Sequence, residues 1–349
     1  MRVTWVVREA DPELPSGGDR YDAAAISRWR AAGAQVEVVT ATGHWPHPDG
    51  VARDELEQRW DRLPDDPVIV DGLIGGACPE AVRRSAGRRP TLLLVHLPLP
   101  VEAPADRRDD LAEREHAAAR AAHVVVTTSH WAAQDVRDRY PGCAPVLVAA
   151  PGVEPAPVSP GHGGEGHVPQ LLVLGSLTPR KGLLVLLEAL GAVADLAWQV
   201  VLAGPAPDAA HLAALRVAAD RTGIADRVHQ PGPLTDGELE DAWAATDLLV
   251  HPSRVETFGM VVTEAQARGI PAVVVQGTGA QEALGGTAGT AVGPDADDLA
   301  QALRDWLTDP ALRRRWRDEA LARRASLPGW ETTVAALDAA VQRARQDAA

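Results

Sequence analysis

The stretch Ala245–Glu264, ATDLLVHPSRVETFGMVVTE, decides the fold, because it joins an apolar strand, a loop and the start of a helix. The loop carries Glu256, and Glu264 follows eight positions later. That places Glu264 about one and a half turns into a helix that we expect to start near Gly259. In a parallel α/β sheet, ligands bind where a strand ends, since the free amides of the next helix point into that crevice. The stretch therefore predicts a ligand site with two carboxylates.

Two interpretations of these carboxylates stay open on local grounds. Amides and carboxylates together suit a ligand rich in hydroxyls and phosphate, because a carboxylate accepts hydrogen bonds from a pair of sugar hydroxyls. Alternatively, Glu256 is a solvated loop charge and Glu264 a surface helix charge, the usual state of glutamate. Residue usage favours the ligand, since the chain's one Phe, Phe258, and its one Met besides the initiator, Met260, both lie here.

The single lysine marks a second candidate point. Every other basic residue among the 34 Lys+Arg is arginine, and Lys181 stands beside Arg180 in LVLGSLTPRKG, directly before an expected helix. Two cations at a helix N-terminus suit a diphosphate, and the alternative is an ordinary basic turn. The sequence does not contain the Walker pattern GxxxxGK[ST].

Length and composition limit the class of protein. A chain of 349 residues with 46% hydrophobic residues fits two domains of about 150–180 residues each. The formal net charge of −14 argues against nucleic acid or an anionic membrane as the main partner. Cys78 and Cys143 are far apart, so neither a disulfide framework nor a zinc site is indicated. No signal peptide core or apolar run of about 18 residues occurs, and we expect a cytoplasmic protein.

Short β-branched runs alternate with alanine-rich helical patterns through the whole chain, which indicates parallel sheets with crossover helices. We predict an N-terminal Rossmann-like domain at 1–155, a linker at 156–169, a C-terminal Rossmann-like domain at 170–328, and a helix at 329–349 that crosses back to the first domain. The strands expected in the first domain are Val3–Val7, Gln35–Thr40, Val68–Val70, Thr91–His96, His123–Thr127 and Val146–Ala149. Those expected in the second are Leu171–Leu174, Gln199–Ala203, Arg227–Gln230, Leu248–His251, Ala272–Val275 and Thr290–Val292. The closing helices are expected at Pro310–Ser326 and Trp330–Ala344.

Two strand ends in the first domain carry candidate residues. The first strand leads into Pro15–Tyr21, PSGGDRY, where Gly17 and Gly18 permit close approach of the backbone to a ligand. The alternative is a plain turn into a helix capped by Asp19. The fourth strand ends in VHLPLP and places His96 at the carboxyl edge, where a lone histidine is either structural or catalytic.

Two other patterns carry no site. The sequence GHGGEG at Gly161–Gly166 matches GxGxxG, but it precedes a strand instead of following one, so we reject it as a dinucleotide fingerprint. The run RRRWR at Arg313–Arg317 is interpreted as a solvated face balanced by neighbouring acids.

The chain resembles the family-4 glycosyltransferases of the GT-B fold, in which two Rossmann-like doubly wound parallel-sheet domains face each other across a cleft. The resemblance covers nearly the whole chain and rests on PSGGDRYD, VHLPLP, TTSHWAAQDV, APGVE, LVLGSLTPRKGLLVLLEAL and HPSRVETFGMVVTEAQARGIPAVV. The last of these contains the family's E-x7-E motif. It implies a retaining, metal-independent glycosyltransferase whose donor is a nucleoside-diphosphate sugar, with a UDP-sugar favoured and no further cofactor.

The resemblance also implies roles for single residues. Arg180 and Lys181 would hold the donor's diphosphate, Glu264 the ribose hydroxyls, and Glu256 the transferred sugar. The residues of the second domain expected to contact the donor are Ser176, Arg180, Lys181, Glu256, Thr257, Phe258, Gly259, Met260, Val261 and Glu264.

In the first domain, Gly17 and Gly18 would approach the donor phosphates, and His96 would lie beside the reacting sugar. The chain departs from the family pattern in three places. Ser176 stands where many members have Arg, Thr257 stands where Gly is usual, and the later GG-x-PE pattern reads TGAQEAL at Thr278–Leu284. We expect no other acid at a strand end close to His96. A carboxylate nucleophile is therefore not expected. The resemblance implies instead that the acceptor attacks from the side that the diphosphate leaves.

Other functions are considered beside transfer. A nicotinamide dehydrogenase would need GxGxxG in its proper context, which is missing. An epimerase, a phosphorylase or a non-catalytic sugar-nucleotide binding protein on the same fold remains an alternative. The helix expected at Asp106–Ala122 carries at least as many acids as arginines, which favours a small soluble acceptor over a lipid. The oligomeric state is not predicted.

Overall fold

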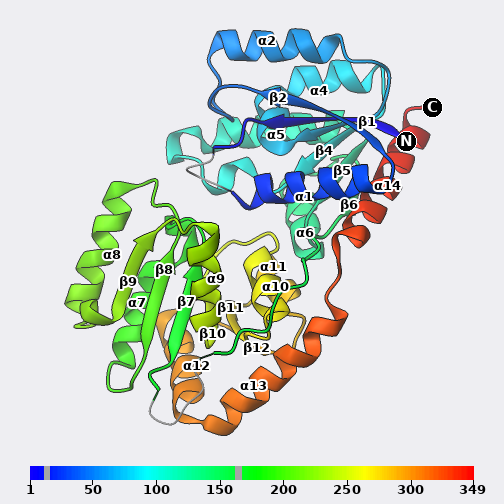
Figure 1. The fold of residues 1–349 in the computed structure, drawn as a ribbon. Helices are drawn as coiled ribbons and strands as arrows, with labels where there is room; N and C mark the ends of the chain where they lie inside the picture. Colours follow the sequence, from blue (N-terminus) through cyan, green and yellow to red (C-terminus); the bar gives the residue numbers. More distant parts are fainter. Residues whose placement is uncertain (12–15, 162–166) are drawn as a thin grey trace. The chain divides into compact units, whose positions relative to one another are not determined.

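The structure is a computed structural model that describes residues 1–11, 16–161 and 167–349. Its residues form two compact units: unit 1 comprises Met1–Gly152 and Gly329–Ala349, and unit 2 comprises Val153–Pro328. Each unit is built on a six-stranded parallel sheet with flanking helices (Figure 1). The predicted fold class is thereby confirmed. Pro15 and residues 162–166 of the rejected GxGxxG match lie outside the described residues.

Unit 1 has the strand order β2-β1-β3-β4-β5-β6. Its strands are β1 (Arg2–Arg8), β2 (Gln35–Ala41), β3 (Val68–Asp71), β4 (Thr91–Val95), β5 (Val124–Thr127) and β6 (Val146–Val148). Its helices are α1 (Gly17–Ala31), α2 (Gly50–Asp61), α3 (Gly72–Ala77), α4 (Pro79–Ala86), η1 (Leu99–Val101), η2 (Ala105–Arg107), α5 (Arg108–Ala121), α6 (His130–Arg139) and α14 (Trp330–Asp347). The order reverses between β1 and β3, and such a switch point is where α/β sheets bind ligands.

The last helix, α14, completes unit 1. Trp29 of α1 donates from Nε1 to Asp338 of α14 at 3.1 Å, and Thr333 donates from Oγ1 to the carbonyl of Ala150 at 2.7 Å. Trp60 of α2, which is 1% exposed, is one of the buried apolar residues in the core of unit 1. The end of the chain therefore stabilises the unit that the beginning of the chain forms.

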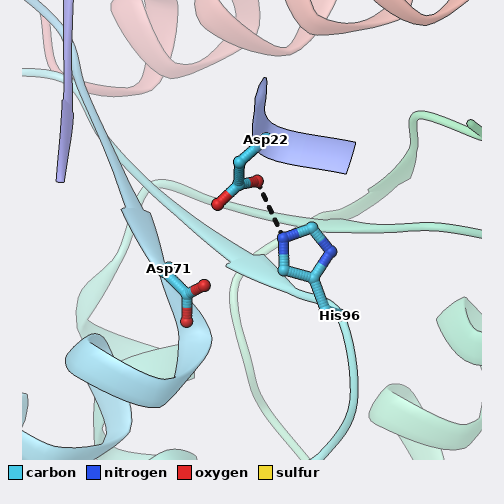
Figure 2. Close-up of side chains that lie close together, drawn as sticks. All are labelled: Asp22, Asp71 and His96. Atoms are coloured by element: carbon cyan, nitrogen blue, oxygen red, sulfur yellow. Dashed lines mark hydrogen bonds and ion pairs between the residues drawn. The ribbon is translucent and has the colours of Figure 1, made fainter. Parts of the chain in front are cut away.

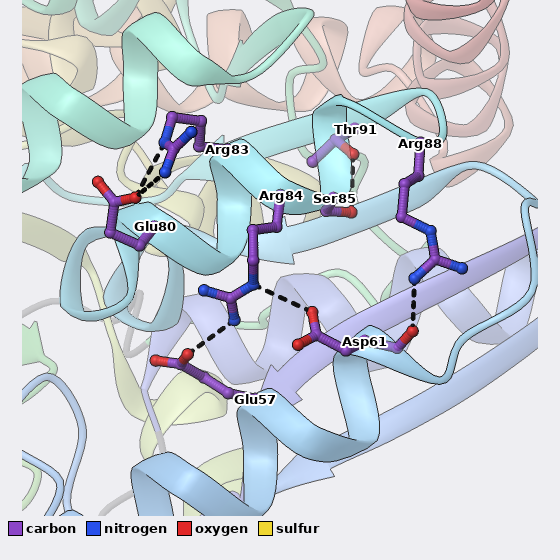
Figure 3. A network of polar contacts seen from close by, with 8 residues as sticks. All are labelled: Glu57, Asp61, Glu80, Arg83, Arg84, Ser85, Arg88 and Thr91. Atoms are coloured by element: carbon purple, nitrogen blue, oxygen red, sulfur yellow. Dashed lines mark hydrogen bonds and ion pairs between the residues drawn. The ribbon is translucent and has the colours of Figure 1, made fainter.

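Helices α2 and α4 carry surface ion pairs of unit 1 (Figure 3). Arg84 reaches Glu57 at 2.8 Å and Asp61 at 3.3 Å, and Arg88 donates to the carbonyl of Asp61 at 2.7 Å. Exposed pairs of this kind contribute only about 0.2–1 kcal/mol each. They connect α2 with α4, and we assign them no catalytic role.

Unit 2 has the strand order β12-β11-β10-β7-β8-β9. Its strands are β7 (Gln170–Leu174), β8 (Gln199–Ala203), β9 (Val228–Gly232), β10 (Leu248–His251), β11 (Ala272–Val275) and β12 (Gly289–Val292). Its helices are η3 (Pro179–Lys181), α7 (Leu183–Ala192), α8 (Ala209–Arg221), η4 (Ala225–Arg227), α9 (Asp236–Ala245), α10 (Met260–Ala267), α11 (Gly279–Leu284), α12 (Ala296–Thr308), α13 (Pro310–Arg323) and η5 (Arg324–Ser326). This sheet reverses its order between β7 and β10.

Every predicted strand occurs, and none of its ends is displaced by more than two residues. The prediction that Arg313–Arg317 is a solvated face is wrong for both of its terminal arginines. Arg313 donates to the carbonyl of Leu307 at 2.6 Å, with its guanidinium 5.8 Å from the ring centroid of Trp306. Arg317 donates to the carbonyl of Ser159. These side chains satisfy backbone carbonyls instead of pairing with acids in water.

No helix among the described residues is both long enough and apolar enough to cross a membrane.

Candidate active site

Two loops of unit 2 meet at the switch point between β7 and β10. One follows β7 and contains η3, and the other follows β10 and contains Glu256. Beside them lies a narrow pocket. Its lining includes Gly175, Ser176, Leu177, Lys181, His251 and Ser253. The strand order therefore brings the sequence's two candidate points, the lysine and the first glutamate of the motif, to one place.

Backbone contacts fix the two loops against each other. The amide of Arg254 donates to the carbonyl of Arg180 at 3.0 Å, and Arg180 donates from Nη1 to the carbonyl of Val255 at 2.8 Å. Gly182 follows with φ of +68°, and a Cβ there would lie 2.2 Å from the carbonyl oxygen of Pro252. Glycine is therefore required at 182, both for its conformation and for the close approach.

Glu256 is the centre of an ionic cluster. Its Oε2 lies 2.7 Å from Nζ of Lys181, 3.0 Å from Nε2 of His251 and 3.5 Å from Nη1 of Arg180. Only 8% of Glu256 is exposed. Because a carboxylate only accepts, His251 donates from Nε2. The two loops are thus joined by charge as well as by backbone.

The charges of this cluster control the pKa of its carboxylate. Burial alone raises the pKa of Glu256, but Lys181, His251 and Arg180 outweigh burial and hold that pKa well below its ordinary value. Burial also lowers the pKa of His251, which favours its neutral form. In this cluster one carboxylate therefore faces two permanent cations beside the pocket. Cations at such a point can also act on an anionic group such as a phosphate.

Helix α10 begins at the end of the second loop. Its N-cap, Gly259, has φ of +86° and, being glycine, supplies no side-chain hydrogen bond to the first turn. The amide of Gly279 donates to the carbonyl of Glu256 at 2.7 Å, and a Cβ at Gly279 would lie 2.2 Å from the carbonyl oxygen of Thr257. Gly279 therefore packs against the loop and holds it in place.

The predicted residues of unit 2 lie on these two loops and on α10. Ser176 and Lys181 line the pocket, and Arg180 and Glu256 belong to the ionic cluster. The remaining predicted residues lie on the loop and on α10; they are Thr257, Phe258, Gly259, Met260, Val261 and Glu264. Of these, Glu264 is partly exposed on α10, whereas Phe258 is only 7% exposed.

Sequence reasoning missed two residues of this site. His251 ends β10 and binds Glu256, and Ser253 lines the pocket with 1% exposure and no hydrogen-bond partner for Oγ within the described chain. The available signal was the polar sequence HPS at the end of an apolar strand, which places side chains at the ligand-binding edge.

In unit 1, Gly17 and Gly18 are the first two residues of α1. The helix is capped by Ser16, whose Oγ accepts from the amide of Asp19 at 3.1 Å, while Asp19 accepts from the amide of Ser16 at 3.2 Å. Asp19 thus completes a capping box and is not the cap itself. Gly18 lies against His96, since a Cβ at Gly18 would be 3.1 Å from Cδ2 of the imidazole.

The expectation that no other acid lies at a strand end close to His96 is wrong. Asp71 ends β3, and Asp22 of α1 lies within 2.8 Å of Nε2 of His96 through its Oδ1 (Figure 2). One ligand atom from each of these three side chains lies within 4.8 Å of the other two. Sequence reasoning did not find this cluster, because Asp22 and His96 are 74 positions apart. An acid that closes the apolar strand VIVD was the available signal for Asp71.

The pKa values of this cluster, Asp22, Asp71 and His96, are all raised above their ordinary values. Burial raises the pKa of Asp71 to about 6 and also raises the pKa of Asp22. Burial by itself lowers the pKa of His96, but the charge and the hydrogen bond of Asp22 outweigh burial and raise it. Asp71 also accepts from the amide of Leu73 at 2.6 Å, so its carboxyl group is held at the start of α3.

Comparison with known proteins gives a family model and relatives. The model described as "Glycosyl transferases group 1" matches residues 161–323. A D-inositol 3-phosphate glycosyltransferase of Streptomyces avermitilis is 33% identical over 237 residues, which is 62% of this chain and 51% of the relative. The enzyme of the same name from Pseudarthrobacter chlorophenolicus is 31% identical over 67% of this chain and 58% of its own length. The chain spans about half the length of the first curated relatives that it matches.

Solved structures match nearly the whole chain. Sucrose-phosphate synthase from Thermosynechococcus elongatus has a TM-score of 0.79 at 20% identity, covering 97% of this chain and 98% of that one. HepE from Anabaena in complex with UDP and glucose has a TM-score of 0.77 at 18% identity, covering 97% and 99%. At such low identity these likenesses concern the fold.

Proposed function

We infer that the protein is an enzyme that moves a sugar from a nucleoside-diphosphate sugar to an acceptor, because the chain has the GT-B fold and its residues 161–323 match the model of the group 1 glycosyl transferases. The observation that carries this inference is the ionic cluster of unit 2. Lys181 and Arg180 meet at Glu256, beside a pocket and beside the start of α10, whose N-cap is a glycine. This arrangement suits a sugar linked to a diphosphate.

On the donor side, each group has a physical task. Lys181 and Arg180 stabilise the negative charge that builds up on the leaving diphosphate, without a metal ion. The first amides of α10 donate to oxygens of the sugar, and Glu264 accepts from the ribose hydroxyls. Glu256 holds Lys181 in place and also borders the sugar. A UDP-sugar is the favoured donor, because the structural relative HepE is described in complexes with UDP and with UDP-glucose.

We place retention of the anomeric configuration within the same proposal. The acceptor hydroxyl attacks from the side that the diphosphate leaves, and a departing phosphate oxygen takes the acceptor's proton. His96 then supports the sugar ring. The pairing of His96 with Asp22 is also what a general base for inversion would use, so the configuration of the product separates the two mechanisms.

The proposed acceptor is a small soluble molecule. The relatives from Streptomyces and Pseudarthrobacter are named for D-inositol 3-phosphate, so this compound is the first acceptor to test. Helix α5 exposes acids at Asp109 and Asp110 as well as arginines, which gives it no basic face for an anionic lipid.

The test is to incubate the protein with a panel of nucleoside-diphosphate sugars, with and without inositol phosphate, and to analyse products by mass spectrometry. Acceptor-dependent release of nucleoside diphosphate together with a glycosylated acceptor supports transfer. Isomerised donor would indicate an epimerase, sugar phosphate formed from inorganic phosphate a phosphorylase, and binding without turnover a non-catalytic protein. Each of these three results contradicts the proposal.

A further inference from the structure

His96 is held on three sides within unit 1. Its Nε2 lies 2.8 Å from Oδ1 of Asp22, and the ring of Tyr21 packs edge-on with its centroid 5.0 Å away. Against the third side lies Gly18, where a Cβ would approach the imidazole to 3.1 Å. Tyr21 is fixed in turn by its hydroxyl, which donates to the carbonyl of Ala149 at 2.8 Å. The imidazole therefore has one defined orientation.

The contact with Asp22 also fixes where the imidazole carries its proton. When Asp22 is ionised, its carboxylate accepts hydrogen bonds and does not donate them, so Nε2 of His96 holds the hydrogen of this contact. In the neutral ring, Nδ1 is then a lone-pair acceptor. Figure 2 shows this second nitrogen on the side of the ring that faces away from both carboxylates. The side chain of His96 is 15% exposed, so a ligand has access to it.

Burial of the carboxyl group of Asp22 costs free energy that a purely structural role does not explain. Its side chain is 8% exposed, and a second carboxyl group, Asp71, lies in the same cluster. Arg8, whose charge acts on Asp22 as well, forms its ion pair with Asp19. Burying two carboxyl groups near one imidazole costs free energy that a well-packed apolar residue at position 22 would avoid. Such a cost is typical of a residue retained for function.

We propose that Asp22 is a positioning residue that holds His96 as the Nε2–H tautomer and so presents Nδ1 to a hydroxyl of the transferred sugar. This inference rests on the proposed glycosyl transfer. Asp22 itself does not touch the sugar. It determines which nitrogen of His96 faces the sugar and whether that nitrogen accepts or donates. A donating Nδ1 would leave the sugar hydroxyl without its acceptor.

The test is Asp22→Asn, which keeps the shape of the side chain and reverses its hydrogen bonding. The amide group of asparagine donates to Nε2, which moves the imidazole proton to Nδ1. Nitrogen-15 NMR of the free protein, at a pH alkaline enough to keep imidazoles neutral, reports the tautomer directly. The His96 signals are assigned by their loss in His96→Gln. We expect Nε2–H in the wild type and Nδ1–H in Asp22→Asn.

Turnover is the second readout. We expect kcat of Asp22→Asn to fall about 10- to 100-fold with the KM for the donor little changed, since one hydrogen bond to the reacting sugar is lost. Asp338→Asn is the matched control, because it also replaces a carboxylate of unit 1 by its amide and keeps an acceptor for Nε1 of Trp29. It should alter neither the tautomer nor kcat. Asp22→Glu, which restores a carboxylate, should recover the Nε2–H tautomer.

Each result decides for or against the inference. An unchanged tautomer in Asp22→Asn overturns it whether or not the protein transfers sugar, because that measurement needs no substrate. A changed tautomer with wild-type kcat overturns the link to catalysis. Stabilisation of the wild type by Mn²⁺ or Zn²⁺, lost in Asp22→Asn, would mean that the cluster binds a cation and would also overturn it. Failure of the proposed function is seen separately, as a wild-type protein without transfer.

Discussion

Replacing Lys181 with methionine removes the chain's single lysine and keeps most of its length. Nζ of Lys181 lies 2.7 Å from Oε2 of Glu256, and these side chains are 16% and 11% exposed. The change therefore affects two properties at once. It leaves a buried carboxylate with a weaker set of partners, and it removes one of the two cations proposed to hold the diphosphate.

The size of each effect follows from the contacts. Removing one partner of a buried ion pair costs about 3–5 kcal/mol. We expect the lower end, about 3 kcal/mol of unfolding free energy, because His251 at 3.0 Å and Arg180 at 3.5 Å still face the carboxylate. A hydrogen bond to a charged group contributes about 1.5–3 kcal/mol, so UDP should bind about 10- to 150-fold more weakly.

Calorimetric titration with UDP and with uridine separates these effects. A diphosphate contact weakens the binding of UDP and leaves the binding of uridine unchanged, whereas a partly unfolded protein loses both equally. Arg304→Met is the control, because Arg304 pairs with exposed Asp195 at 2.9 Å and does not line the pocket. Equal losses for UDP and uridine, or an unchanged affinity for UDP, would refute the assignment of Lys181 to the diphosphate.

Three further changes test other parts of the account. Ser253→Ala should weaken UDP binding several-fold in titration and leave the free energy of unfolding equal or higher, because Oγ has no partner in the described chain; unchanged affinity counts against Ser253 as a donor contact. Burial raises the pKa of Glu115 from 4.5 to about 7, so between these pH values the folded chain binds more protons than the unfolded chain. The free energy of unfolding, measured by urea titration, should therefore depend on pH in the wild type and lose this dependence in Glu115→Gln. The wild type should then lose about 3 kcal/mol as the pH rises through that range, and an equal loss in the variant would refute this. Gly18→Ala should lower turnover by displacing His96, with little change in melting temperature; full turnover would show that the position of His96 is not critical.

The fold was predictable because the strands are short and apolar and end in turn residues. The runs at Gln199–Ala203, Leu248–His251 and Ala272–Val275 are observed with the predicted bounds. Their order in the sheet is a tertiary property. It was the reversal between β7 and β10 that brought Lys181 to Glu256, 75 positions along the chain. The motif therefore predicted which residues belong to the candidate site, and the strand order of the sheet explained why Lys181 and Glu256 lie together.

What sequence reasoning missed depends on contacts between distant residues. Asp22 lies in the middle of a helix pattern, and nothing local indicates that its side chain is buried against His96. Asp71 extends β3 by one residue beyond the predicted strand, and a short apolar pattern does not fix its own end. In the same way, the sequence predicts a surface charge at Arg313, because it does not show that the side chain donates to the carbonyl of Leu307.

The most direct measurement is the configuration of the first-formed product. With an α-linked donor and an acceptor that supports turnover, the anomeric coupling in proton NMR is read before any mutarotation. The account predicts an α-linked product, and it predicts that His96→Ala forms the same product more slowly. A β-linked product would contradict retention and would instead assign the pair His96 and Asp22 to removal of the acceptor's proton.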